Sequence, residues 1–384
     1  MAAEPARRIL LTADTVGGVW PFAIELAGQL LGAGDRVLLA AMGGVPNAAQ
    51  RDDLRALPGI EFHWRPYKLV WMREPWDDLE AAADWLHDLA GQFRPDVIHL
   101  NDLALADHDW PAPVLQGVHS CVCSWWQAVR GEAAPREWDR YRARVAASVQ
   151  AADHIVAPSA AMLEAVAAHY GAPASAEVIA NGRSAPAAST RAKEPFVLGA
   201  GRLWDEAKNL SALDAAAARL PWPVYVAGAA RSPEAADGDP VAQWQGVRPL
   251  GALPNAELRE WMACAGIYAL PARYEPFGLS ALEAAQAGCA LVLGDIPSLR
   301  EVWAEAAVYV PPSDTAALQA ALLRLIDDAA LRHEMGQRAR LRAQRYTPEA
   351  MSQRYRHAYA ALSQRPAPCP PPLVRQPFPA GAHA

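Results

Sequence analysis

The chain has 384 residues, of which 52% are apolar and 20% charged, and its formal net charge is −7. This length suits two globular domains, and the composition excludes collagen-like, coiled-coil and disordered acidic chains. The negative charge argues against a general nucleic-acid binder, which would carry a basic stripe. The apolar run at 9–13 is too short for a signal peptide or a bilayer span. Five cysteines without framework spacing predict a reducing compartment, the cytoplasm.

The first half of the chain alternates short apolar runs with amphipathic stretches. Between Val19 and Leu30 apolar residues recur at three- and four-residue spacing, which predicts a helix. Apolar runs precede and follow it, so strand, helix and strand form a parallel crossover unit. The expected strands are 8–13, 37–42, 96–100, 114–118 and 154–157, and the expected helices are 19–30, 79–93, 138–151 and 160–170.

A second series of the same kind follows a stretch rich in Ser, Ala, Pro and Thr. Its expected strands are 196–200, 224–227, 267–270 and 290–294, and its expected helices are 210–219, 256–264 and 279–287. The fold class is therefore α/β, with two doubly wound, Rossmann-like domains facing across a cleft. The predicted divisions are an N-terminal domain 1–184, a linker 185–194, a C-terminal domain 195–346, a packed helix 347–363 and a disordered proline-rich tail 364–384.

Residues with chemical potential follow the predicted strands, where ligands of doubly wound sheets bind. Gly17 and Gly18 lie between a strand and a helix, where their backbone amides can approach a diphosphate; a tight turn without a binding role is the alternative. In the second half, Arg202 and Lys208 provide two cations for a dianionic group. Gly199-Ala200-Gly201 lacks the third glycine of a dinucleotide fingerprint, so NAD binding is disfavoured.

The densest signal is the stretch 273–283, in which Glu275 precedes a predicted helix and Glu283 lies on it. A carboxylate accepts two hydrogen bonds, as the vicinal diol of a sugar or ribose requires. The amides of Phe277, Gly278 and Leu279 are expected to be free for a sugar or phosphate. An ordinary helix glutamate is the alternative for Glu283, although its apolar neighbours make an unpartnered carboxylate costly.

In the first half, His119 directly follows the predicted strand 114–118. It is a candidate to hydrogen-bond a sugar hydroxyl or to move a proton, and a structural role is the alternative. Nine of the fourteen tryptophans precede residue 150, which indicates an aromatic-lined side with Trp20, Trp71 and Trp125 as candidates. The aromatic and basic stretch from Trp64 to Trp76 predicts a binding loop. Peripheral contact with an anionic membrane and ordinary packing are the alternatives.

These residues resemble the GT-B fold, retaining glycosyltransferases of family 4, which use UDP-, GDP- or ADP-sugars. The likeness runs from about Ile9 to Leu362, and its most specific element is the glutamate pair Glu275 and Glu283. Its other elements are Gly17-Gly18-Val19, Asp96-Val97-Ile98-His99, Val118-His119, Asn181-Gly182, Gly201-Arg202 and Lys208-Asn209. Trp20-Pro21-Phe22 and Arg183-Ser184 depart from the residues that usually follow the first glycines and the Asn-Gly turn of this family.

The resemblance implies that the first domain is the acceptor side and the second binds a nucleotide-sugar donor, with the helix 347–363 crossing back to the first. Glu283 would hold the donor ribose and Glu275 the donor sugar. The implied catalytic residues are His119, Arg202, Lys208 and Glu275. The implied donor-binding residues are Gly17, Gly18, Arg202, Lys208, Glu275, Phe277, Gly278, Leu279 and Glu283.

The activity so implied is retaining transfer of a hexose to a glycan, glycolipid or small molecule, with no cofactor and no metal. Asp237-Gly238-Asp239 has the acid-x-acid form of a metal site, but its context predicts a solvated loop. The alternatives are a nucleotide-sugar epimerase or hydrolase of the same fold and an inactive nucleotide-sugar-binding partner subunit. The expected location is cytoplasmic, with peripheral attachment to the inner membrane face as the alternative.

Overall fold

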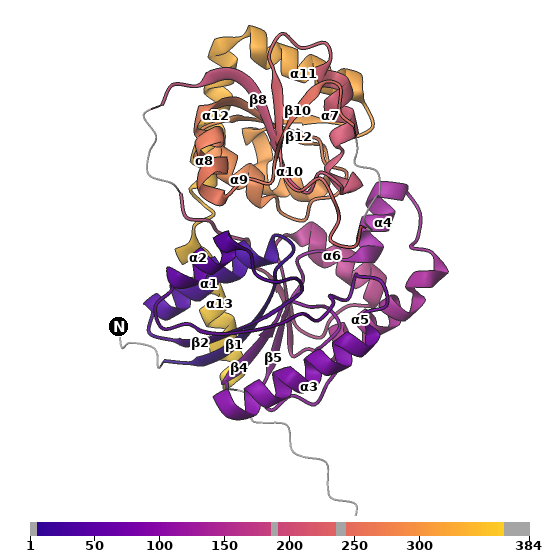
Figure 1. Ribbon diagram of the computed structural model, residues 1–384, viewed down its shortest axis with the longest axis vertical. Coiled ribbons are helices and arrows are strands. Elements are labelled where there is room, and N and C mark those ends of the chain that lie inside the picture. Colours follow the sequence, from indigo (N-terminus) through magenta and orange to yellow (C-terminus); the bar gives the residue numbers. More distant parts are fainter. Residues whose placement is uncertain (1–5, 186–190, 236–242, 365–384) are drawn as a thin grey trace, which may run out of the picture.

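The computed structural model describes residues 6–185, 191–235 and 243–364 and shows two α/β units, one above the other in Figure 1. Each unit is built on one parallel sheet, the first with strand order β3-β2-β1-β4-β5-β6-β7 and the second with order β10-β9-β8-β11-β12-β13. The two doubly wound, Rossmann-like units predicted from the sequence are confirmed. Half of the predicted linker (186–190), the predicted tail beyond residue 364 and Asp237-Gly238-Asp239 lie outside the described residues.

The N-terminal sheet is covered by helices on both faces, so its central strands are continuous apolar runs. In β1, for example, the side chains from Ile9 to Ala13 are all buried. Its strands are β1 Arg8–Asp14, β2 Arg36–Met42, β3 Glu61–Arg65, β4 Val97–Leu100, β5 Val114–Gly117, β6 His154–Ala157 and β7 Ala176–Val178. Its helices are α1 Val19–Gly32, α2 Ala48–Arg55, α3 Trp76–Phe93, α4 Val122–Arg130, α5 Asp139–Ala151 and α6 Ala160–Tyr170, with a 3₁₀ turn at Arg136–Trp138.

The C-terminal unit repeats this plan around a six-stranded sheet, in which β11 and β12 are buried over their whole lengths. Its strands are β8 Glu194–Ala200, β9 Val224–Ala227, β10 Val247–Gly251, β11 Ala265–Leu270, β12 Ala290–Gly294 and β13 Val308–Val310. Its helices are α7 Leu210–Ala217, α8 Asn255–Cys264, α9 Leu279–Gln286, α10 Pro297–Trp303, α11 Thr315–Asp327 and α12 Ala329–Ala343, with 3₁₀ turns at Glu206–Lys208 and Ala304–Ala306.

The last helix, α13 Pro348–Ser363, crosses back and packs against α1 and β4 of the N-terminal unit, as the family resemblance implies (Figure 1, yellow). The hydroxyl of Tyr359 lies 2.8 Å from Nδ1 of His99, and both side chains are buried. Burial lowers the pKa of His99 to about 3, so its ring is neutral and accepts or donates one hydrogen bond here. The two passages of the chain between the units touch at Gly182, where a Cβ would lie 2.2 Å from the carbonyl oxygen of Thr347.

Tyr359→Phe should lower the free energy of unfolding by about 1–3 kcal/mol, because a buried ring nitrogen of His99 loses its partner. Urea unfolding measures this difference. Tyr225→Phe is the matched control, since its hydroxyl receives only a 3.4 Å contact from Arg248 near the surface. A loss of the same size in both variants would contradict an anchoring role for Tyr359.

Candidate active site

The loops that follow β1, β8 and β11 meet where the two units face each other. A Cβ on Gly17 would lie 3.3 Å from Nη1 of Arg202, and one on Gly18 would lie 3.8 Å from the side chain of Leu279. Asp14, at the end of β1, shapes the glycine turn by accepting the amide N–H groups of Val16 and Gly17 at 2.9 Å each. The carboxyl ends of both sheets therefore converge, as ligand sites of this fold require.

Two of the predicted cations lie on the loop between β8 and α7. Arg202 is 38% exposed and donates to Asp205 at 2.7 Å, while Lys208 extends along the backbone of Gly201. Burial acts to raise the pKa of Asp205, but Arg202, Lys208, the Trp125 indole and a backbone amide outweigh it and lower that pKa. Asp205 thus stays ionised and orients Arg202, a role that the sequence did not reveal because the residue lies in an irregular loop.

The stretch from Arg273 to Glu283 forms the loop after β11 and the start of α9. Glu275 accepts Nζ of Lys208 at 2.5 Å through one oxygen and the amide N–H of Gly278 at 3.0 Å through the other. The prediction of a free amide at Gly278 is therefore wrong for this state, because the glutamate three residues earlier occupies it. Within the described chain no partner is recorded for the amides of Phe277 and Leu279. The ring of Phe277 itself is core, with 2% exposure.

The second glutamate of the pair, Glu283, is held by the residue at which the chain departs from the family pattern. Arg183 donates to Oε1 of Glu283 at 2.7 Å and to Glu25 on α1 at 3.2 Å. The side chains of Arg183, Glu25 and Glu283 are only 6%, 11% and 14% exposed. One buried cation thus joins a carboxylate of each unit, and Oε2 of Glu283 is the oxygen without a recorded partner among the described residues. The sequence marked Arg183 as unusual, but its partners are 158 and 100 residues away.

His119 follows β5 and lies beside Asn101. The Asn101 amide donates to the carbonyl of Thr12 at 2.7 Å, so its oxygen accepts from Nε2 of His119 at 2.8 Å. His119 therefore carries its proton on Nε2, and Nδ1 has only a lone pair to offer. Burial lowers the pKa of His119 to about 4, so the ring is neutral. With this tautomer His119 could only accept a hydrogen bond from a sugar hydroxyl, not donate one as predicted. Asn101, which fixes the tautomer, was not singled out from the sequence.

The three aromatic candidates differ in their surroundings. Trp20 is 3% exposed and donates to Asp53, so the prediction that it faces an acceptor is wrong. Trp125 donates its indole N–H to Asp205 at 3.0 Å and so belongs to the contact between the units. Trp71 is half-buried against the N-terminal core.

The stretch from Trp64 to Trp76 is only partly a loop. Trp64 lies within the edge strand β3 and donates to the carbonyl of Gly44, whereas Trp76 begins α3. All three tryptophans of this stretch, including Trp71, are half-buried against core residues, which favours packing over lipid contact. Among the described residues no helix combines the length and apolarity needed to cross a membrane.

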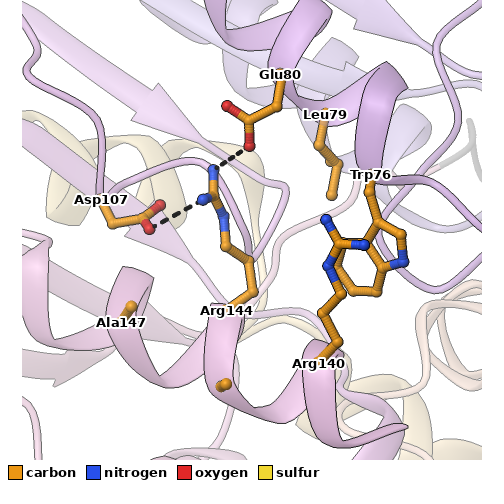
Figure 2. Close-up of a pocket in the computed structure, with 8 residues that line it drawn as sticks. Trp76, Leu79, Glu80, Asp107, Arg140, Arg144 and Ala147 are labelled. Atoms are coloured by element: carbon orange, nitrogen blue, oxygen red, sulfur yellow. Dashed lines mark ion pairs between the residues drawn. The ribbon is translucent and has the colours of Figure 1, made fainter. Parts of the chain in front are cut away.

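A cavity on the N-terminal unit lies away from these loops, between α3 and α5 (Figure 2). Its central cation, Arg144, is matched by Glu80 at 3.3 Å and Asp107 at 3.4 Å. Its second cation, Arg140, lies over the ring of Trp76 at 4.2 Å. With its charges balanced in this way the cavity has no excess charge to bind a nucleotide.

Comparison with known proteins identifies related sequences in both units. The family described as Glycosyltransferase Family 4 matches residues 16–184, and that described as Glycosyl transferases group 1 matches residues 183–342. O-antigen chain mannosyltransferase B of Escherichia coli is 31% identical over 116 residues, which are 30% of each chain. Glycogen synthase of Mycobacterium tuberculosis is 40% identical over 97 residues, 25% of this chain and 23% of that protein. The matched segment thus spans less than a third of either curated relative.

Solved structures resemble the whole described fold. Sucrose-phosphate synthase from Thermosynechococcus elongatus superposes with a TM-score of 0.74 at 21% identity, over 92% of this chain and 100% of that one. Anabaena Alr3699/HepE in complex with UDP-glucose superposes with a TM-score of 0.71 at 18% identity, over 93% and 100% of the two chains.

Two parallel Rossmann-like units whose strand ends meet at a cationic, carboxylate-rich site define the GT-B fold, which the solved structures share. The chain belongs to the glycosyltransferases: its N-terminal unit matches Glycosyltransferase Family 4 and its C-terminal unit matches Glycosyl transferases group 1.

Replacing Arg183 by methionine should destabilise the protein by about 3–5 kcal/mol, because Glu25 and Glu283 would remain buried without their cation. Thermal and urea unfolding measure the loss. The matched control is Arg130→Met, which breaks a second ion pair between the units, with Glu206, whose side chains are 42% and 52% exposed. That change should cost under about 1 kcal/mol. Equal losses of unfolding free energy in the two variants would show that the Arg183 cluster stabilises the protein no more than an exposed ion pair does.

Proposed function

We propose that this glycosyltransferase takes a hexose from a nucleoside-diphosphate sugar and transfers it with retention of configuration, without a metal ion. The observation that carries the proposal is the 2.5 Å contact between Lys208 and Glu275, with Arg202 on the same loop as Lys208. The ammonium group of Lys208 suits the diphosphate that leaves, and the carboxylate of Glu275 suits hydroxyls of the sugar that is transferred.

Donor binding would exchange one partner for another at Lys208. Each cation of the site is paired with a carboxylate: Arg202 with Asp205, Lys208 with Glu275 and Arg183 with Glu283. A diphosphate carries more negative charge than a carboxylate and would displace Glu275 as the ion-pair partner of Lys208. Glu275 would then be free to accept hydrogen bonds from the sugar, while the free oxygen of Glu283 accepts from the ribose.

Retention follows from the same pairing. As the bond between sugar and phosphate breaks, negative charge grows on the diphosphate, where Arg202, Lys208 and the amides of Phe277 and Leu279 would stabilise it. Glu283 and Asp205 are each ion-paired with an arginine, which disfavours either as a covalent nucleophile. The acceptor would then attack on the face from which the phosphate departs, and that phosphate would take its proton.

The metal-free proposal rests on the two cations that already supply the charge a metal would bring. Within the described ranges no cluster of three or more His, Cys, Asp or Glu side chains could hold an ion.

UDP-glucose is the donor to test first, because a structurally similar protein is described in complex with it. The acceptor, a sugar, lipid or small molecule, would enter from the N-terminal unit beside His119. The four described cysteines are free, which supports a cytoplasmic location.

Glu275→Gln should lower donor turnover by about a hundredfold or more, because the amide keeps the shape but loses the charge that interacts with the transferred sugar. Release of nucleoside diphosphate measures turnover. The affinity for that nucleotide should stay within a few fold. Retained turnover would sink the proposed role, and a chain that no longer folds would make Glu275 structural.

Lys208→Ala should weaken the binding of a nucleoside diphosphate by about tenfold to a hundredfold, as expected for a charge-assisted hydrogen bond. The bare nucleoside should bind with nearly unchanged affinity. Titration calorimetry with both ligands compares the two effects. Because the change also unpairs Glu275, the double variant Lys208→Ala with Glu275→Gln serves as the control. Equal weakening of nucleoside and diphosphate would refute a diphosphate contact.

A further inference from the structure

A second cationic pocket lies on the C-terminal unit, at the amino ends of its central strands. The proposed donor site lies at the carboxyl ends of the same strands. It is formed where β8, β11 and β12 begin, between α8, the end of α9 and α12, and has a volume of about 380 Å³. Arg202 and Glu275 follow the other ends of β8 and β11. The pocket therefore cannot be part of the site described above, although both belong to the same unit.

The charge of this pocket is opposite to that of the chain as a whole. Its cations are Arg191, Lys193, Arg259, Arg332 and Arg340, and the carboxylate among its lining residues is that of Glu260. The formal net charge of the chain is −7, so five cations around one small space are a local concentration against the general trend. Arg191, Lys193 and Arg340 are exposed, so solvent screens part of the repulsion within this cluster, and a bound anion would relieve the rest.

Internal contacts leave most of this charge uncompensated. Arg191 pairs with Glu260 at 3.1 Å, whereas Lys193 and Arg332 donate to backbone carbonyls, of Met262 at 3.0 Å and of Leu325 at 2.6 Å. Carbonyls satisfy hydrogen bonds but do not neutralise a cation. Arg259 and Arg340 have no recorded hydrogen bond or ion pair within the described chain, and the Nε atom of Arg259 is buried without a partner.

A second unpartnered atom narrows the chemistry of the ligand. Gln286, at the end of α9, donates its amide to the carbonyl of Arg183 at 2.8 Å, which fixes the orientation of the side chain. Its oxygen Oε1 is buried without a partner among the described residues, and Gln286 lines the pocket. An amide oxygen can only accept, and a fully ionised phosphate offers no donor, so a donor such as a hydroxyl group suits this place.

We propose that this pocket binds a phosphorylated sugar, with its phosphate on Arg259 and Arg340 and a sugar hydroxyl donating to Gln286. Guanidinium groups suit phosphate through paired N–H donors, and a space of this size accommodates a hexose phosphate. The ligand would lie one hydrogen bond from Arg183, at the passage between the two units. The site does not depend on the proposed donor chemistry, because it lies at the other edge of the sheet.

Titration calorimetry on the full chain tests the proposal with four probes: glucose 6-phosphate, ribose 5-phosphate, inorganic phosphate and glucose. We expect at least one sugar phosphate to bind more tightly than inorganic phosphate by about tenfold, and glucose to bind more weakly than either. The variant Arg259→Ala with Arg340→Ala should weaken sugar-phosphate binding by about tenfold or more. The matched control, Arg219→Ala with Arg338→Ala, removes two exposed cations of the same unit from outside the pocket and should leave affinity within about twofold.

Lys208→Ala distinguishes the two sites, because sugar phosphates could also enter the proposed donor site. Binding that survives in this variant and is lost with Arg259 and Arg340 supports the pocket, whatever the fate of the donor proposal. Binding lost with Lys208 alone, or weakened equally by the control pair, overturns it. Absence of binding by both sugar phosphates also overturns it, and equal affinity for sugar phosphate and inorganic phosphate overturns the role of the hydroxyl. A thermal melt of each variant confirms that it is folded.

Discussion

The relation between the two units depends on one buried guanidinium. Arg183 lies where the chain leaves the N-terminal unit, and it holds Glu25 of α1 and Glu283 of α9 at hydrogen-bond distance. Two carboxylates so close and so poorly hydrated repel each other, and the cation makes their proximity favourable. Because Arg183 takes Oε1 of Glu283, the same contact that joins the units also decides which oxygen of the glutamate can meet a ligand.

The other charged groups of the site follow the same rule of internal pairing. Lys208 with Glu275 and Arg202 with Asp205 form a site whose charges are compensated by ion pairs within the protein. A ligand must therefore offer more negative charge than a single carboxylate in order to displace these partners. This requirement favours a diphosphate over a monoanion, and in the proposed mechanism Glu275 would be released only once the diphosphate is bound.

The sequence predicted the central strands and most long helices because buried parallel strands are continuous apolar runs between glycine-rich loops. It missed β3, β7, β10 and β13 because edge strands are short and half polar, as in β3, where Glu61 and Arg65 are exposed. Glu275, Glu283, Arg202 and Lys208 do lie at converging loops. The partners of these residues could not be predicted, because Arg183 contacts carboxylates on two helices that are distant in the sequence. Nor could the burial of Trp20, which packs against Phe62 of β3, a strand the sequence did not reveal.

The central claim is that the loops after β8 and β11 bind the diphosphate of a nucleotide sugar. Thermal unfolding with UDP, GDP, ADP, TDP and NAD, each at saturating concentration, tests it most directly. The account predicts that one nucleoside diphosphate raises the stability by about 2.7 kcal/mol at a hundred times its dissociation constant. A response to NAD alone, or to none of the five ligands, would contradict the assignment of Arg202, Lys208 and the two glutamates.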